Sequence, residues 1–265
     1  MESENIIFAF ILTAIAGLST GIGSLIALIA KQTNTKFLCA SLGFSAGIMI
    51  YVSFMEMLPQ AKDFLVADYG EKVGTLYLII AFFAGIGLIN FIDFLIPDSV
   101  NPHEIQGVED MSAKNSSLRR TGLLVALTIA IHNFPEGIAT FMAALGSLDV
   151  AIPITVAIAI HNIPEGIAVA VPIYHSTGSK KKAFWLSFAS GLAEPVGALL
   201  AYLFLLQYWS HTMNGIIFAV VAGIMVFISL DELLPSAEKY GKHHISIMGL
   251  TSGMLVMAVS LYLFI

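Results

Sequence analysis

Charged residues and cysteines are scarce in this sequence of 265 residues. Only 11% of the residues are charged, and Cys39 is the single cysteine. One cysteine excludes an intrachain disulfide and thiolate metal sites of the CxxC kind, and the few basic residues form no patch that would bind nucleic acid. Apolar residues make up 57% of the chain and the mean hydropathy is +0.87, which excludes a water-soluble globular protein.

The apolar residues lie in long runs, each sufficient to cross a lipid bilayer as a helix. They predict an all-α polytopic membrane protein, a single membrane domain over residues 1–265 with eight transmembrane helices. The predicted spans cover residues 6–30, 37–61, 73–96, 121–145, 151–172, 183–207, 213–235 and 245–265. The first span is not a cleavable signal peptide, because no Lys or Arg precedes it and its apolar run is too long. The one substantial loop, residues 97–120, is polar.

The basic residues predict the orientation, because Lys and Arg are enriched in cytoplasmic loops. With both termini outside, ten of the twelve basic residues face the cytoplasm. These ten are Lys31, Lys36, Lys114, Arg119, Arg120, Lys180, Lys181, Lys182, Lys239 and Lys242, whereas Lys62 and Lys72 lie outside. The sequence therefore predicts a multi-pass plasma-membrane protein that is N-out and C-out, with the loop 97–120 in the cytoplasm.

Two internal repeats indicate a transporter architecture. Residues 130–140 (AIHNFPEGIAT) and 159–169 (AIHNIPEGIAV) match at nine of eleven positions with an offset of 29. Residues 46–61 and 222–237 match at nine of sixteen positions, which places Glu56 and Glu232 in equivalent settings. Because the predicted spans that hold the second pair cross the membrane in opposite directions, we expect an inverted repeat, as in transporters that bind their substrate near the midplane.

The HNxPEG motif places chemistry-bearing side chains on one helical face. At 100° per residue, Glu136 lies between His132 and Asn133 around the helix axis. A second copy of this face comes from His161, Asn162 and Glu165. If the two helices pack as an antiparallel hairpin, His132 faces Glu165 and Glu136 faces His161. Imidazoles and carboxylates suit zinc, iron(II), manganese and similar divalent ions, whereas magnesium and calcium need no histidine.

Span six adds a further carboxylate, Glu194, at about the same depth. Pro135 and Pro164 interrupt the helical hydrogen bonds one residue before each motif glutamate. Burying each carboxylate at the centre of a membrane costs roughly 2.5–3.5 kcal/mol, and a bound dication or protons would offset that cost. The structural alternative is that His132 and His161 only join packed helices by hydrogen bonds, and interhelical packing is also an open role for the asparagines.

A second polar set lies nearer the predicted cytoplasmic side. Its members are Asn90 and Asp93 late in span three and Asp231 and Glu232 late in span seven. They either form a route by which ions leave the midplane or lie hydrated and inert at the interface. Glu56, near the outer end of span two, either attracts incoming cations or has the same inert role.

The paired motifs HNFPEG (132–137) and HNIPEG (161–166), the Glu194-Pro195 pair and the predicted spans resemble the ZIP family of zinc and iron transporters, most closely its bacterial ZupT branch. The resemblance covers essentially the whole chain. It implies import of zinc, with iron, manganese, cobalt and cadmium as further substrates, through a midplane site for two ions. By this resemblance the first ion is held by His132, Glu136, His161 and Glu165, and the second by Asn133, Asn162, Glu194 and the two shared glutamates.

The same resemblance implies a homodimer and a 3+2+3 arrangement of helices. In it, a moving bundle of spans one, four, five and six works against a more static bundle of spans two, three, seven and eight. The cytoplasmic loop holds only His103, which departs from the histidine cluster of many relatives and argues against a metal-sensing role for it.

Two other functions fit the same residues. One is an intramembrane metal-dependent hydrolase that uses zinc-activated water, but the sequence contains neither an HExxH motif nor a nucleophile motif, so we expect no enzyme. The other is an exporter that exchanges metal for protons. The sequence does not determine the direction of transport.

Overall fold

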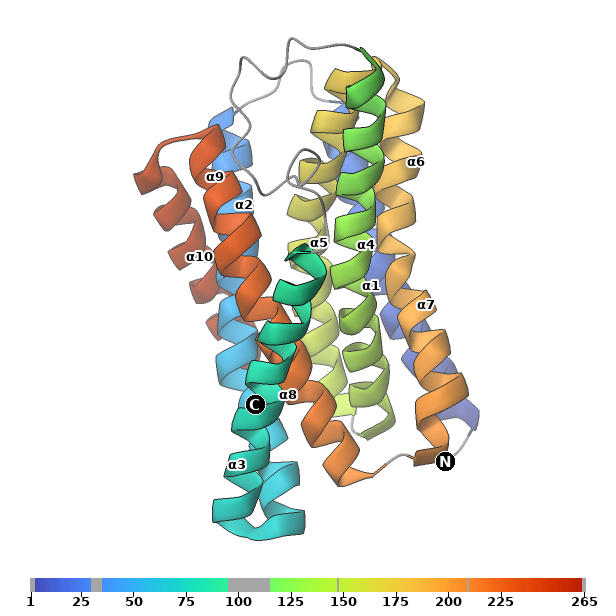
Figure 1. Cartoon of the computed structure of the whole chain (residues 1–265), viewed down its shortest axis with the longest axis vertical. Coiled ribbons are helices and arrows are strands. Elements are labelled where there is room, and N and C mark those ends of the chain that lie inside the picture. The colour runs from blue at the N-terminus through green and yellow to red at the C-terminus, as the bar shows by residue number, and fades with distance from the viewer. Residues whose placement is uncertain (1–2, 30–34, 95–114, 147, 209, 264–265) are drawn as a thin grey trace.

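The computed structural model describes residues 3–29, 35–94, 115–146, 148–208 and 210–263, and all regular structure in these ranges is helical. Figure 1 shows long helices that run roughly along one axis. The α-helices are α1 (Ser3–Ile29), α2 (Thr35–Val52), α3 (Leu58–Phe94), α4 (Asn115–Gly146), α5 (Leu148–Thr177), α6 (Lys180–Gly191), α7 (Ala193–Leu200), α8 (His211–Ile228), α9 (Leu234–Tyr240) and α10 (His243–Leu263). Short π-helical segments η1 (Ser53–Met57), η3 (Ala201–Leu205) and η5 (Ser229–Leu233) and the 3-10 segment η4 (Leu206–Tyr208) join some of them end to end.

Within the described ranges, six segments are long and apolar enough to cross a membrane. They are Asn5–Ile29, Thr35–Phe94, Ala151–Val171, Lys180–Tyr208, His211–Lys239 and His243–Leu263. Their outer faces are apolar too: Phe83 of α3 is 62% exposed and Leu255 of α10 is 64% exposed. Such faces suit a lipid environment, and the chain is an all-helical, polytopic membrane protein.

The longest of these segments folds back on itself at Gly70. Gly70 has a φ of 76°, a left-handed conformation that glycine adopts without a steric cost, and Figure 1 shows the chain of α3 turning back on itself at the lower end of the molecule. An ion pair of 2.7 Å between Lys62 and Glu71 links the two limbs. The chain is therefore helical up to this reversal, nine residues beyond the predicted end of the span at residue 61, and the span itself stays a prediction.

The predicted loop over residues 97–120 also needs a correction. Helix α4 begins at Asn115, so the last six residues of that loop are helical, and residues 95–114 lie outside the described ranges. Hydropathy misses this first turn because it is polar.

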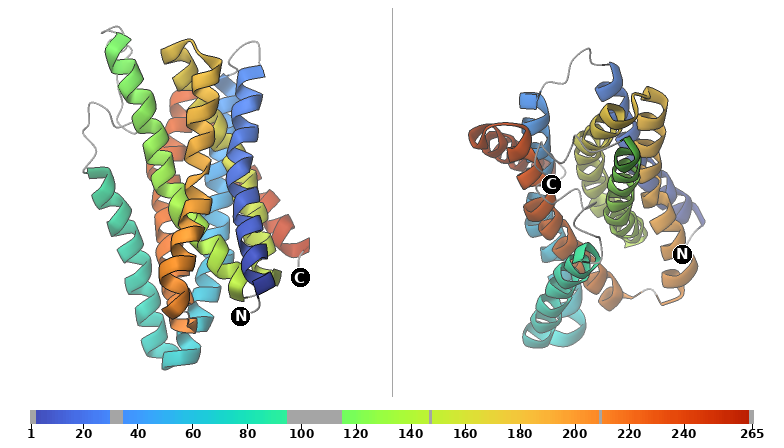
Figure 2. Two further views of the ribbon diagram at one scale, coloured as in Figure 1. Left: turned by 90° about the vertical axis from the view of Figure 1, so that its right-hand side faces the viewer. Right: turned by 45° about the horizontal axis from the view of Figure 1, so that its top comes forward.

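The helices pack in two groups, which Figures 1 and 2 show from several sides. In the first group α5 packs along α1 and α4, and α4 also packs along α7; in the second group α3 packs along α8 and α2 along α10. Contacts of α5 with α2 and of α4 with α8 join the two groups. Helices α4 and α5, which carry the HNxPEG motifs, thus lie at the seam between the groups.

Glycines bring the helices of each pair unusually close together. A side chain at any of several glycines would collide with a backbone carbonyl of the neighbouring helix. In the second group these pairs are Gly85 with Val220, Gly223 with Phe82, Gly47 with Leu250, and Gly253 with Phe44. Such small residues allow the backbone contact that holds helices together where hydrophobic driving force is weak.

Two glycines on one helix test this packing. The methyl group of Gly85→Ala would overlap the Val220 carbonyl, whereas that of Gly87→Ala would meet nothing within 4 Å. Alanine favours a helix over glycine by about 1 kcal/mol, but overpacking costs about 1–3 kcal/mol. We expect Gly85→Ala to lower the thermal unfolding midpoint of the protein in detergent and Gly87→Ala to leave it equal or higher. Equal midpoints for the two variants would show that close α3–α8 contact does not stabilise the fold.

Candidate metal centre

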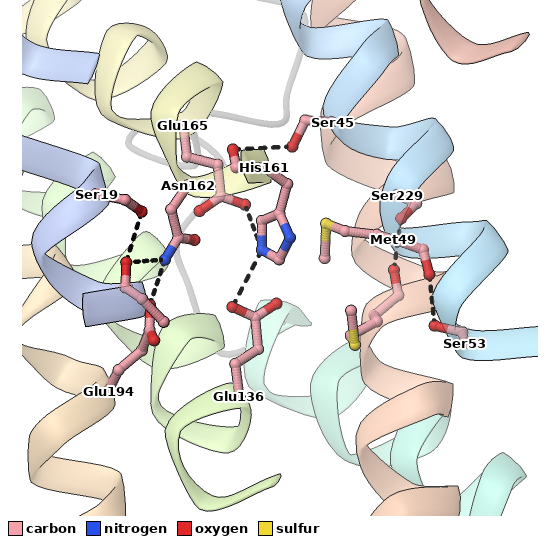
Figure 3. Close-up of polar contacts among 12 residues, drawn as sticks. Ser19, Ser45, Met49, Ser53, Glu136, His161, Asn162, Glu165, Glu194 and Ser229 are labelled. Atoms are coloured by element: carbon pink, nitrogen blue, oxygen red, sulfur yellow. Dashed lines mark hydrogen bonds and ion pairs between the residues drawn. The ribbon is translucent and has the colours of Figure 1, made fainter. Parts of the chain in front are cut away.

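Polar side chains from three helices meet between the two helix groups. Glu136 comes from α4, His161, Asn162 and Glu165 come from α5, and Glu194 comes from the first turn of α7. Each of these side chains is at most 1% exposed, and Figure 3 shows them directed toward one another. A polar cluster of this kind inside an apolar helix bundle is a candidate site for a cation.

The imidazole of His161 lies between two carboxylates. Its Nε2 is 3.3 Å from Oε2 of Glu136 on the facing helix and 3.9 Å from Oε1 of Glu165 one turn later on its own helix. The contact with Glu136 is the juxtaposition that the antiparallel hairpin predicts. The second predicted pair, His132 with Glu165, stays a prediction, because the His132 side chain lies outside the described part of the structure.

Asn162 joins this cluster to Glu194 and to helix α1. Its Nδ2 donates a hydrogen bond to Oε1 of Glu194 and another, of 2.9 Å, to the carbonyl oxygen of Ala16. From helix α2, Ser45 Oγ donates to the His161 carbonyl oxygen at 3.3 Å. These bonds fix the turn of α5 that carries His161 and Asn162, and Oδ1 of Asn162 is left as an acceptor.

Several atoms of the cluster are buried without a hydrogen-bond partner among the described residues. They are Oε1 of Glu136, Oδ1 of Asn162 and Oε2 of Glu194, and the buried Asn133 of α4 likewise has no partner for Nδ2 or Oδ1. Leaving a buried polar atom unsatisfied costs about 1–3 kcal/mol, so unpaired oxygens gathered at one place favour a ligand. A cation is the ligand that oxygen acceptors suit.

The described part of the site is open rather than a closed cage. Among the described side chains, no group of three His, Cys, Asp or Glu lies close enough together to enclose a metal ion. The His132 imidazole and the oxygens of Asn133 and Asn162 are not counted in such a group, although the family resemblance assigns all three a place in the site.

Close backbone contact positions the site glutamates. A side chain at Gly137 would collide with the Glu194 carbonyl, and one at Gly166 would collide with the Thr20 carbonyl. These glycines directly follow Glu136 and Glu165. The final glycine of each HNxPEG motif therefore lets the motif helix approach α7 or α1 closely, which explains a residue that ligand chemistry alone does not require.

The second polar set lies on other elements. Asn90 and Asp93 are on α3, where Asn90 is exposed and Asp93 half-buried, and Asp231 and Glu232 are on η5, where Asp231 is exposed and Glu232 is buried. Glu56 is half-buried on η1, where its carboxylate accepts a hydrogen bond from Gln60. All of these residues lie outside the cluster around His161 described above.

The π-helical segments are a feature that sequence reasoning missed. Ser53 Oγ donates to the Met49 carbonyl and Ser229 Oγ donates to the Met225 carbonyl, both at 2.7 Å. Each serine begins a π-helical segment that carries Glu56 or Glu232. The repeat of residues 46–61 and 222–237 contains a signal for these segments, because both copies have Met and Ser four residues apart. Single-turn π-helical insertions are frequent at functional sites.

Comparisons with known proteins identify the family. Residues 98–261 match the ZIP zinc transporter family. The chain is 60% identical over 263 residues to the zinc transporter ZupT of Streptococcus mutans serotype c, covering 99% of this chain and 100% of the relative. It is 56% identical over 278 residues to zinc transporter ZupT of Clostridium perfringens, covering 99% and 98% of the two chains. For zinc transporter ZupT of Oceanobacillus iheyensis the identity is 57% over 265 residues, covering 98% and 99%.

These matches confirm the resemblance drawn from the paired motifs. Because the relatives are matched over nearly their whole length, the likeness extends to the helices on both sides of the site. The family consists of transporters and not of enzymes, so the intramembrane hydrolase is excluded. The chain belongs to the ZIP family of zinc transporters.

Proposed function

We propose that this protein imports zinc into the cytoplasm, together with other divalent transition ions such as iron(II), manganese(II), cobalt(II) and cadmium(II). The observation that carries the proposal is the buried cluster in which His161 lies between Glu136 and Glu165. The names of its relatives support zinc as the substrate. Imidazole nitrogen with carboxylate oxygen is a donor set that zinc and similar ions prefer.

The distances within the cluster are compatible with one shared ion. Ligand atoms that lie about 2.0–2.2 Å from a tetrahedral zinc ion are separated from one another by roughly 3.4 Å. Nε2 of His161 is 3.3 Å from Oε2 of Glu136 and 3.9 Å from Oε1 of Glu165, distances near that separation, although the three described groups do not enclose an ion as they stand. We assign the first ion to these residues and His132.

A second ion is assigned to Asn133, Asn162 and Glu194, with the two motif glutamates shared between the ions. The unpartnered oxygens of Asn133, Asn162 and Glu194 support this assignment, because each can bind a cation without breaking a hydrogen bond. Amide oxygens hold transition ions more weakly than imidazole does, and weak coordination suits a site that must release its ion.

The cation also offsets the cost of burying acidic groups. Three carboxylates, Glu136, Glu165 and Glu194, are at most 1% exposed, and each costs roughly 2.5–3.5 kcal/mol at the centre of a membrane. A divalent ion removes much of that cost while it is bound. Substrate binding therefore changes the electrostatic energy of the seam between the two helix groups, which can couple binding to movement.

The route on either side of the site follows the acidic residues of the repeat. We propose that ions approach past Glu56 and leave past Asn90, Asp93, Asp231 and Glu232. The matched π-helical segments that carry Glu56 and Glu232 support this route. Export in exchange for protons is the alternative direction, and only transport in vesicles of defined orientation distinguishes the two.

The proposed topology has eight membrane passes, outside termini, an inverted repeat and the cytoplasmic loop predicted above. The paired glycine contacts support the repeat. Gly223 and Val220 of α8 lie 176 residues after Gly47 and Phe44 of α2, and both pairs make the same contacts with a neighbouring helix, α3 in one case and α10 in the other. The homodimer implied by the family stays a prediction.

A substitution of Glu165 distinguishes a metal ligand from a residue with only a structural role. We expect Glu165→Gln to abolish zinc uptake into proteoliposomes, because an amide cannot supply the negative charge. Glu238→Gln is the matched control, since Glu238 pairs with His243 and is 43% exposed. Both variants should elute from a size-exclusion column as folded protein. If Glu165→Gln took up zinc as well as the wild type does, Glu165 would not be a ligand of the site.

A substitution of Glu194 tests whether this residue holds a second ion. We expect the wild-type protein to bind two zinc ions at equilibrium and Glu194→Gln to bind one, since His132, Glu136, His161 and Glu165 remain. Elemental analysis after equilibrium dialysis against buffered zinc, corrected for the zinc in the dialysate, gives the ratio of metal to protein directly. Two ions bound to Glu194→Gln would contradict the assigned role of Glu194.

Competition between metals tests the donor chemistry. Iron(II), manganese(II), cobalt(II) and cadmium(II) should each reduce uptake of radioactive zinc, whereas a tenfold excess of magnesium or calcium should not, because those ions prefer oxygen ligands alone. Inhibition by magnesium equal to that by cadmium would indicate a site that does not use the imidazole groups.

A further inference from the structure

Two apolar crevices lie beside the metal centre, one against each motif helix. The α4 crevice has a volume of about 580 Å³ and is lined by α4, α3, α8 and η3. The α5 crevice has a volume of about 410 Å³ and is lined by α5, α2, α1 and α10. Each lies in the seam between the two helix groups.

Equivalent residues of the two repeats line the two crevices. On the motif helices, Ile131, Phe134, Pro135 and Ile138 line the α4 crevice, and Ile160, Ile163, Pro164 and Ile167, each 29 residues later, line the α5 crevice. The opposite walls also correspond. Ile216, Ile217 and Val220 of α8 lie 176 residues after Ala40, Ser41 and Phe44 of α2. The crevices are therefore built into the repeat rather than left by imperfect packing at one place.

The lining excludes water as the occupant. Every described residue that lines the α4 crevice is apolar, and among the described residues the α5 crevice adds only Ser41 and Ser252. A buried water needs two to four polar partners, whereas an apolar cavity of about 150 Å³ stays dry and binds benzene. Both crevices are larger than that and partly open, and apolar atoms packed into them would gain contacts that an empty crevice lacks.

The shape of the α4 crevice favours a thin occupant that enters from the lipid. Leu88 and Ile216 at its edge are 49% and 40% exposed, whereas Ile89 and Val221 are 5% and 3% exposed. An α-helix is about 10 Å across, so a volume of this size holds little more than one turn of a partner helix. The lining residues outside α4 belong to membrane-spanning segments, where hydrocarbon chains are the surrounding medium.

We infer that each crevice binds one acyl chain of a membrane lipid. The chain in the α4 crevice contacts Pro135, which stands between Asn133 and Glu136 in the motif. The chain in the α5 crevice contacts Pro164, which stands between Asn162 and Glu165. The two chains thus fill the seam on both sides of the metal centre and pack against the turns that carry its ligands.

Crevice-filling variants with matched controls test this inference. Leu88→Trp fills the α4 crevice, and Leu76→Trp is its control because Leu76 is on the same helix, 52% exposed, and outside the crevice. Ile26→Trp fills the α5 crevice, with Ile22→Trp of α1, 51% exposed, as its control. Ile216→Trp and Ser252→Trp are second variants for the two crevices in case the first do not fold.

The measurement is the number of lipids that stay bound. The full chain is reconstituted in vesicles of dioleoylphosphatidylcholine, extracted again in detergent and weighed by native mass spectrometry. We expect two retained lipids for the wild type and both controls, one for each single crevice variant and none for the double variant Leu88→Trp/Ile26→Trp.

Two results would overturn the inference. One is equal lipid retention by crevice variants and controls, including a wild type that retains none. The other is loss of a dimer in the crevice variants without loss of lipid, which would make the crevices interfaces between copies of the chain. Because the readout contains no zinc, it is independent of whether the proposed transport function holds.

Discussion

The contact between Glu136 and His161 is the interaction on which the rest of this structure depends. It joins the two motif helices at a place where neither side chain is more than 1% exposed. Burial makes the contact costly without a cation, because a carboxylate loses its hydration there. A divalent ion bound here, as proposed above, would supply the missing positive charge, so the substrate itself would complete the electrostatics of the fold at this point.

Close helix packing makes that contact possible. The glycines that end the two HNxPEG motifs lie against backbone carbonyls of α7 and α1, so α4 and α5 are held by neighbours of their own group. On their other sides the same helices face the two apolar crevices. The motif helices are thus packed tightly on one side and loosely on the other, an arrangement that would suit the ion exchange proposed for their side chains.

The sequence predicts this site better than it predicts the helix ends. The offset of 29 residues between the motifs and the expectation of a hairpin place Glu136 against His161, as in the structure. Hydropathy ends a span at residue 61, yet the helix continues to the reversal at Gly70. Hydropathy does not report this extension, because charged residues such as Lys62 and Glu71, which pair with each other, lower the hydropathy without ending the helix.

Other features could not be predicted because they depend on contacts between distant segments. The hydrogen bond from Asn162 to the Ala16 carbonyl and the one from Ser45 to the His161 carbonyl link residues more than a hundred positions apart. The π-helical segments at Ser53 and Ser229 follow from local backbone hydrogen bonding, which hydropathy does not report. The repeat marks both serines, but it does not indicate what they do.

Anomalous diffraction at the zinc absorption edge, from crystals of the zinc-loaded protein, tests the central claim most directly. The account predicts a peak about 2.0–2.2 Å from Nε2 of His161 and from carboxylate oxygens of Glu136 and Glu165. A peak found only elsewhere in the molecule, with His161 still in direct contact with Glu136, would contradict it.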